Sequence, residues 1–217
     1  MIHLERLPKP DILVKKEKEW TEKFLASDKS RPDNSKYAHP EIKALLFAMS
    51  SGKCFYCEQK ISQDYHEVDH FIEISDIEGR ELAFDWDNLF LACDNCNGKL
   101  NNKVLPADSV LNPCEHTNEE IEAVLDFENE HIVMRNNRDI GYRTIQKYKL
   151  DSPQLDLYRA RRLNQFYQVL VAIQKKQNSE HRDWLNPLER EELRRFTQKD
   201  HAFSFMFQCL FQKTQIL

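Results

Sequence analysis

The chain has 217 residues, 41% of them hydrophobic and 11% aromatic, which is enough to bury the core of one large domain or two small ones. No apolar stretch approaches the roughly 20 residues of a membrane-spanning helix, and residues 1–9 lack the apolar core of a signal peptide, so we expect a cytoplasmic protein with no membrane contact. The net charge of −5 argues against a protein that grips a polyanion without help, because affinity for phosphates comes mainly from clustered Lys and Arg.

The first segment, residues 1–50, is expected to be helical. An amphipathic helix is predicted over 10–28, where apolar residues recur at helical spacing in a lysine-rich background. A second helix is predicted to begin at Pro40, a favourable first-turn residue, and to end at Gly52.

The segment 51–106 is predicted to contain two strands and a helix. Residues 67–74 alternate and include β-branched and aromatic side chains, which is typical of a strand, and 89–93 form a second short apolar strand. A capping residue at 94–95 predicts a helix that runs to about Lys103. The local order is therefore strand, loop, strand, helix.

The remaining segment, 107–217, is predicted to be mostly helical. Its expected elements are a short helix over 119–124, a strand over 127–135, a helix beginning at Ser152-Pro153, one beginning at Pro187 and a last one over 201–211. Together the three segments predict an α+β protein in which a small central unit is embedded among helices.

Four of the six cysteines form two Cys-x-x-Cys pairs, Cys54/Cys57 and Cys93/Cys96. In a chain without a secretion signal, two such pairs are typical of a zinc site rather than of disulfides. The alternative, four unrelated buried thiols, rarely produces the same spacing twice. Four thiolates leave no open position on the metal, so the predicted zinc is structural.

Further motifs lie between and after these pairs: Val68-Asp69-His70-Phe71-Ile72, Asn88-Leu89, and Asn97 directly after the last cysteine. With the cysteines they resemble, in order and spacing, the zinc-binding form of the HNH (ββα-metal) endonuclease family over about fifty residues. The resemblance implies a zinc-stapled ββα-metal unit that hydrolyses phosphodiester bonds. Asp69 and Asn97 would bind a catalytic Mg²⁺ or Mn²⁺, and His70 would be the general base. Asn88 would hold the loop and orient His70.

The chemistry of these residue types agrees with the implied reaction. Phosphodiester hydrolysis needs an activated water and a cation on the phosphate, and Asp69 is a suitable oxygen ligand while His70 is a workable base near neutral pH. Taken alone, Asp69-His70 would more often be a polar pair on a strand, and Asn97 a residue at a helix start. Two positions depart from the family. Asn97 replaces the more familiar histidine, which leaves the metal preference open, and Glu73 stands where many members carry proline.

Shorter motifs lie outside this unit: Lys36-Tyr37-Ala38-His39-Pro40, Leu111-Asn112-Pro113, Thr144-Ile145, and Leu150 to Leu155 followed by Arg159, Arg161 and Arg162. They are similar, more loosely, to the HNH nuclease subunit of the Septu anti-phage system, relatives of which occur as retron effectors. This resemblance implies an ABC/SMC-type ATPase partner, and in a retron a reverse transcriptase with its RNA–DNA. An acidic nuclease subunit docked on a larger complex need not bind its nucleic acid substrate unaided.

Two alternatives stay open at this point. A non-catalytic zinc module would bind nucleic acid or a protein partner without needing Asp69, His70 and Asn97 together. Alternatively, the helical tail carries the main function and the zinc unit is a brace. The motif does not distinguish DNA, our first choice of substrate, from structured RNA. Lys99 and Lys103 are either phosphate contacts or part of a solvated helix face.

Overall fold

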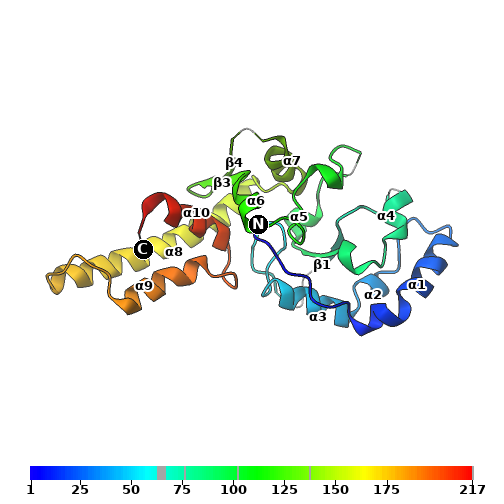
Figure 1. The fold of residues 1–217 in the computed structure, drawn as a ribbon, viewed down its shortest axis with the longest axis horizontal. Helices are drawn as coiled ribbons and strands as arrows, with labels where there is room; N and C mark the ends of the chain where they lie inside the picture. Colours follow the sequence, from blue (N-terminus) through cyan, green and yellow to red (C-terminus); the bar gives the residue numbers. More distant parts are fainter. Residues whose placement is uncertain (63–66, 76, 102, 137, 217) are drawn as a thin grey trace.

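The computed structural model describes residues 1–62, 67–75, 77–101, 103–136 and 138–216. Within these ranges the strands form two separate antiparallel pairs, and helices account for most of the other regular structure. This is the α+β class that the sequence predicts. Figure 1 shows an elongated molecule, with the N-terminal helices at one end, the long C-terminal helices at the other and the central unit between them.

Three helices precede the central unit: α1 (Asp11–Leu25), α2 (Asn34–Tyr37) and α3 (Pro40–Met49). Pro40 occupies the first turn of α3, where no helical partner exists for a backbone N–H. After α3 the chain turns at Gly52, which has a φ of +69°, and a Cβ there would lie 2.6 Å from the Phe47 ring. Both predicted helices are confirmed, the first with shorter bounds.

The central unit contains β1 (Glu67–His70), α4 (Ile77–Glu81), the 3₁₀ helix η1 (Trp86–Asn88), β2 (Leu89–Ala92) and α5 (Asp94–Asn97). The two strands pair antiparallel, with Asp69 opposite Phe90 and His70 opposite Leu89. All four residues of β2 are buried, which explains why this strand is apolar without alternation.

Two elements of this unit are shorter than predicted. The strand expected over 67–74 ends at His70, because the next two backbone N–H groups both bond to Asn88, one to its backbone oxygen and one to its side chain. The helix that follows β2 is a single turn. It stops because the chain turns away and the Leu100 N–H bonds to the Lys147 carbonyl instead of to a helical partner.

The C-terminal segment contains η2 (Ala107–Ser109), α6 (Asn118–Glu122), β3 (Leu125–Glu128), β4 (His131–Met134), α7 (Asp139–Tyr148), α8 (Pro153–Ser179), α9 (Pro187–Arg194), η3 (Arg195–Thr197) and α10 (Ser204–Thr214). The helices predicted at Ser152-Pro153 and Pro187 begin there, and both have a capping side chain. The single strand predicted over 127–135 is wrong, because the chain folds back as the hairpin β3–β4 through Asn129 at φ +57°. Helix α7 was not predicted, and the division at residues 50 and 106 stays a prediction.

The aromatic residues of the last helix lie in the core. Phe205 and Phe207 are buried, and the Phe207 ring packs against Phe166 of α8 with centroids 5.4 Å apart. α10 also contacts the central unit, because the buried Glu58 carboxylate accepts hydrogen bonds from Lys53, at 3.0 Å, and from the Ser204 hydroxyl at the start of α10. The C-terminal helices are thereby held to the cysteine-bearing loop.

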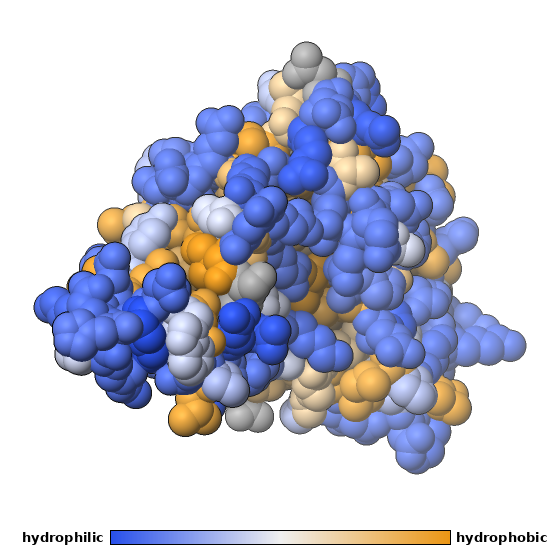
Figure 2. Space-filling model, turned by 60° about the vertical axis from the view of Figure 1, so that its left-hand side comes forward, coloured by the Kyte–Doolittle hydropathy of each residue, from blue (hydrophilic) through white to orange (hydrophobic). Residues whose placement is uncertain are grey.

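The face drawn in Figure 2 is mostly hydrophilic, and its hydrophobic side chains form separate patches. Large exposed hydrophobic residues include Leu157, Tyr167 and Val171 of α8 and Leu188 of α9. Among the helices in the described part of the chain, none is both long and apolar enough to cross a lipid bilayer.

Candidate active site and metal centre

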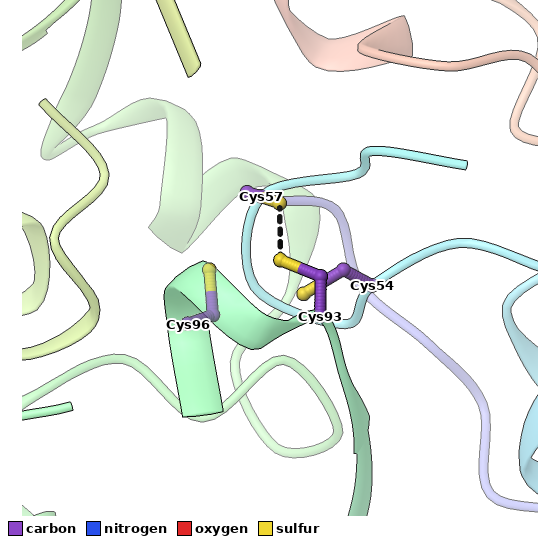
Figure 3. Close-up of side chains that lie close together, drawn as sticks. All are labelled: Cys54, Cys57, Cys93 and Cys96. Atoms are coloured by element: carbon purple, nitrogen blue, oxygen red, sulfur yellow. Dashed lines mark hydrogen bonds between the residues drawn. The ribbon is translucent and has the colours of Figure 1, made fainter. Parts of the chain in front are cut away.

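The four paired cysteines meet at one point, one pair from a loop and the other from the junction of β2 and α5 (Figure 3). The loop is a tight knuckle, closed by a hydrogen bond of 3.0 Å from the Glu58 N–H to the Cys54 carbonyl. The second pair brackets the start of α5, where Cys93 is the N-cap residue and Cys96 lies on the helix. Two short local structures therefore present two sulfurs each.

The positions of the four sulfur atoms fit a metal ion with tetrahedral coordination. All four Sγ atoms lie within 4.8 Å of one another, and those of Cys57 and Cys93 are 3.7 Å apart. Metal–sulfur bonds of about 2.3 Å in a tetrahedron place the sulfurs roughly 3.8 Å apart. All four side chains are buried free thiols. The cluster predicted from the spacing is therefore present and suited to bind a metal ion.

The protonation of these thiols also favours a bound cation. Burial raises the pKa of the Cys57 and Cys96 thiols, whereas hydrogen bonds from the neighbouring thiols, that of Cys54 first, lower the pKa of Cys93. Four buried thiolates at this spacing need a positive charge between them, and thiolates select metals such as zinc.

A second site lies in a cleft of about 620 Å³ along β1 and the end of α5. Three of the four predicted catalytic residues line it: Asp69, His70 and Asn97. The side chains of Asp69 and His70 are both almost fully buried, so little water surrounds them. Asn88 lies outside this cleft, behind the loop that follows β1. The structure brings the first three residues together, and their catalytic roles stay predictions.

The His70 ring is held in a single orientation. Its Nε2 lies 2.9 Å from the Ala83 carbonyl oxygen, which can only accept, so Nε2 carries the proton and Nδ1 is the nitrogen able to take one. The Tyr37 ring packs against it with centroids 4.7 Å apart. Burial lowers the pKa of His70 by more than the bond to Ala83 raises it. A neutral imidazole at pH 7 is the form that a general base requires.

Asn88 holds the loop between β1 and η1 closed. Its Oδ1 accepts from the Ile72 N–H at 2.7 Å, and its Nδ2 donates to the carbonyls of Ile72 at 3.0 Å and Leu82 at 3.2 Å. Leu82 immediately precedes Ala83, whose carbonyl accepts from His70. The predicted effect of Asn88 on His70 would therefore pass through the loop backbone rather than through direct contact.

The Asp69 carboxylate is surrounded by hydrogen-bond donors. The Tyr56 hydroxyl donates to it at 2.7 Å, and the Lys99 ammonium contacts its two oxygens at 2.9 and 2.7 Å and also the His70 carbonyl. The Lys99 side chain is only 5% exposed, so the solvated helix face, one of the two alternatives for this residue, is wrong. Carboxylate and carbonyl oxygens around one positive charge are the ligand types that Mg²⁺ and Mn²⁺ prefer. The ammonium therefore marks a position suited to a cation.

Asn97, the second predicted cation ligand, has a different partner. Its Nδ2 donates to the Glu67 carboxylate, which leaves the Oδ1 as the atom able to bind a metal. Asp69 is held by Lys99 and Asn97 by Glu67. The two predicted ligands share a cleft and both offer oxygen atoms, so the donor set fits a hard divalent cation.

Two tyrosines that lie next to Asp69 and His70 were not predicted from the sequence to belong to the site. Tyr56 lies inside the first Cys-x-x-Cys knuckle and is stacked between Tyr148, with centroids 3.9 Å apart, and Phe90, at 5.9 Å. The position of Tyr56 between the predicted zinc ligands Cys54 and Cys57 was the feature of the sequence that could have identified it. Tyr37 lies in a short motif quoted for another resemblance, and nothing local in the sequence connects it to His70.

Comparison with known proteins defines the class of the central unit. The HNH endonuclease family model matches residues 54–103, so this segment is an HNH endonuclease domain. It contains both cysteine pairs, Asp69, His70, Asn88 and Asn97. The family resemblance predicted from these residues is confirmed.

Among curated proteins, the chain is similar to two that carry the name Septu protein PtuB. The protein from Bacillus thuringiensis is 34% identical over 119 residues, covering 54% of this chain and 44% of the relative. The protein from Bacillus mycoides (strain KBAB4) is 29% identical over 155 residues, covering 58% of this chain and 52% of the relative. The chain spans about half the length of these relatives. The looser resemblance to the Septu subunit is thus supported as well.

Proposed function

We propose that the chain is a metal-dependent endonuclease that hydrolyses phosphodiester bonds, with DNA as the first-choice substrate and structured RNA as the alternative. The observation that carries the proposal is the pairing of His70 and Asp69 in one cleft. A neutral imidazole fixed by Ala83 lies beside a carboxylate that already holds a positive charge. A non-catalytic zinc module has no need of a histidine held in this way, and the HNH domain gives the same reaction class.

Each residue has a distinct task in the proposed reaction. Asp69 and Asn97 would hold a Mg²⁺ or Mn²⁺ ion, which draws charge from the scissile phosphate and the leaving oxygen. His70 accepts a proton from the attacking water at Nδ1. Asn88 maintains the loop that presents the Ala83 carbonyl to His70. The cysteine cluster would bind a structural zinc that contributes folding free energy.

The proposed nuclease is tested with the full chain on plasmid DNA and on total RNA, with Mg²⁺ or Mn²⁺ added. Asp69→Asn is the diagnostic variant, because it keeps the shape of the side chain and its acceptor for Tyr56 while removing the charge. We expect cleavage by the wild type to need the added cation and to be lost in the variant at unchanged zinc content. Equal cleavage by the wild type and the variant would favour the binding-module alternative. So would the absence of cleavage of every substrate when zinc and the partner are present.

We also propose that the chain acts as the nuclease subunit of a bacterial anti-phage complex in the cytoplasm. The partners would be an ABC/SMC-type ATPase and, in a retron, a reverse transcriptase with its RNA–DNA. The support is the similarity to the two Septu proteins and the net charge of −5, which suits a nuclease delivered to nucleic acid by a partner. Co-expression with such an ATPase should yield a complex of fixed ratio in size-exclusion chromatography. Separate elution of the chain and the ATPase at micromolar concentration would contradict the proposed complex.

A further inference from the structure

One wall of the cleft comes from outside the HNH domain. Ser30, Arg31 and Tyr37 line it, although all three precede the first residue of the matched segment, Cys54. They belong to the connection between α1 and α2 and to the end of α2 itself. Another part of the lining is β1, with Asp69 and His70. A substrate in this cleft would therefore touch two parts of the chain that are far apart in sequence.

This wall is held in place by several contacts. Pro32 is buried, and Asp33 caps α2 by accepting a hydrogen bond of 3.0 Å from the Ser35 N–H. Arg80 of α4 crosses to the wall and donates to the Lys29 carbonyl at 3.1 Å. The connection is therefore tied to the HNH domain at a defined position, as a binding surface requires.

The cleft is basic within an acidic chain. Among the residues that the structure describes, three cations line it, Arg31, Arg80 and Lys99, against two carboxylates, Asp69 and Glu73, whereas the chain as a whole has a net charge of −5. Lys99 already pairs with Asp69, which leaves Arg31 of the α1–α2 connection and Arg80 of α4 as the arginines that line the cleft. Arginine is the preferred side chain for phosphate, because its planar fork can donate two parallel hydrogen bonds.

Tyr37 has a separate role on the same wall. Its ring packs against the His70 ring, with centroids 4.7 Å apart and planes inclined by 59°. The other side of the imidazole is fixed by the Ala83 carbonyl at 2.9 Å. Two neighbours therefore restrict the His70 imidazole, the Ala83 carbonyl at its Nε2 and the Tyr37 ring beside it.

We propose that the segment from Ser30 to Tyr37 completes the nuclease site, with Arg31 and Arg80 binding a backbone phosphate of the nucleic acid and Tyr37 positioning His70. The inference rests on the proposed nuclease function and deepens it. It assigns part of substrate binding, through Arg31, to an N-terminal segment outside the HNH domain, while Arg80 belongs to that domain. It also explains how an acidic chain can hold a polyanion locally.

Phosphate binding is tested by fluorescence anisotropy with a labelled duplex and the matching single strand, without added Mg²⁺ or Mn²⁺ and without a chelator, so that no cleavage occurs and the structural zinc is kept. Arg31→Gln is the cleanest variant, because this side chain is exposed, and Arg161→Gln on α8 is the matched control. We expect Arg31→Gln to weaken binding about 5- to 10-fold at low salt. The slope of log K against log salt should fall by about 0.9 on duplex or about 0.7 on a single strand. Arg80→Gln should behave alike, and Arg161→Gln should match the wild type.

Positioning by Tyr37 is tested by steady-state cleavage with Tyr37→Leu and Tyr37→Phe. The leucine variant loses the ring, and we expect kcat to fall at least about 10-fold with KM nearly unchanged, as for a misplaced catalytic group. The phenylalanine variant keeps the ring and should retain activity. Loss of activity in both variants, or in neither, would overturn the positioning role.

The outcomes separate this inference from the function on which it rests. If the wild type cleaves nucleic acid while Arg31→Gln and Arg80→Gln bind as tightly as Arg161→Gln, with the same salt slope, the phosphate-binding assignment is wrong and the nuclease assignment stands. If the wild type neither binds nor cleaves nucleic acid in any assay, both are overturned. Lower affinity and a smaller slope in the two cleft variants alone would support the assignment.

Discussion

Replacing Asn88 by alanine should lower the free energy of unfolding by about 3 kcal/mol. The side chain is 4% exposed and makes three hydrogen bonds, one with the Ile72 N–H and two with the carbonyls of Ile72 and Leu82. Alanine leaves these half-buried groups without their Asn88 partner, and each lost bond of this kind amounts to roughly 1 kcal/mol. Because Leu82 leads into the Ala83 carbonyl that orients His70, cleavage should also fall more than about 10-fold.

The stability change is measured by urea denaturation, followed by tryptophan fluorescence, to which Trp86 in the same short helix as Asn88 contributes. Cleavage is compared at a temperature where both proteins are folded. Asn164→Ala on the exposed side of α8 is the matched control and should change stability by less than about 0.5 kcal/mol. A similarly small change for Asn88→Ala, with full activity, would refute the assignment of Asn88 to the loop and to His70.

Further expectations concern the metal centre, the buried carboxylate of Glu58 and the half-buried carboxylate of Asp126. Cys54→Ser should release the bound zinc and unfold the central unit, seen as metal content and melting temperature, and full zinc retention would contradict the tetrahedral site. Glu58→Gln should destabilise by about 3 to 5 kcal/mol in urea because the buried Lys53 loses its counter-charge, and a loss below about 1 kcal/mol would argue against that pairing. Burial raises the pKa of Asp126, but the hydrogen bond from Lys213 at 2.8 Å contributes to a net lowering. This carboxylate therefore stabilises the fold above its unfolded pKa of about 3.9, and the contribution is lost as the pH falls through that value and below. The difference in stability between wild type and Asp126→Asn should shrink below about pH 4, and a difference that does not vary with pH would contradict the ion pair.

Features set by a few neighbouring residues could be predicted from the sequence. Pro40 begins α3, and Ser152-Pro153 begins α8, because a cap or a first-turn proline acts within one helical turn. The metal centre was predicted for the same reason, since each Cys-x-x-Cys pair forms its own knuckle. Only the meeting of the two knuckles depends on the fold, and a hydrogen bond of 2.9 Å from the Phe55 N–H to the Leu91 carbonyl joins the first knuckle to the strand that leads into the second.

Features set by distant contacts could not be predicted. The helix α5 stops after one turn because Leu100 bonds to Lys147, and β1 stops at His70 because Asn88 takes over the next backbone groups. Neither partner is adjacent in sequence. Tyr37 reaches His70 for the same kind of reason, through the packing of the α1–α2 connection against the cleft. Periodicity and spacing carry no information about such contacts.

The central claim is that His70 is the general base of a metal-dependent nuclease. Its most direct test is the cleavage rate of His70→Ala on the substrate that the wild type cuts, at saturating Mg²⁺ or Mn²⁺, with His131→Ala on the exposed hairpin as control. The account predicts a loss of about 100-fold or more for His70→Ala, at unchanged zinc content and with a native circular dichroism spectrum, and no loss for the control. Equal rates for the wild type and His70→Ala would contradict the claim.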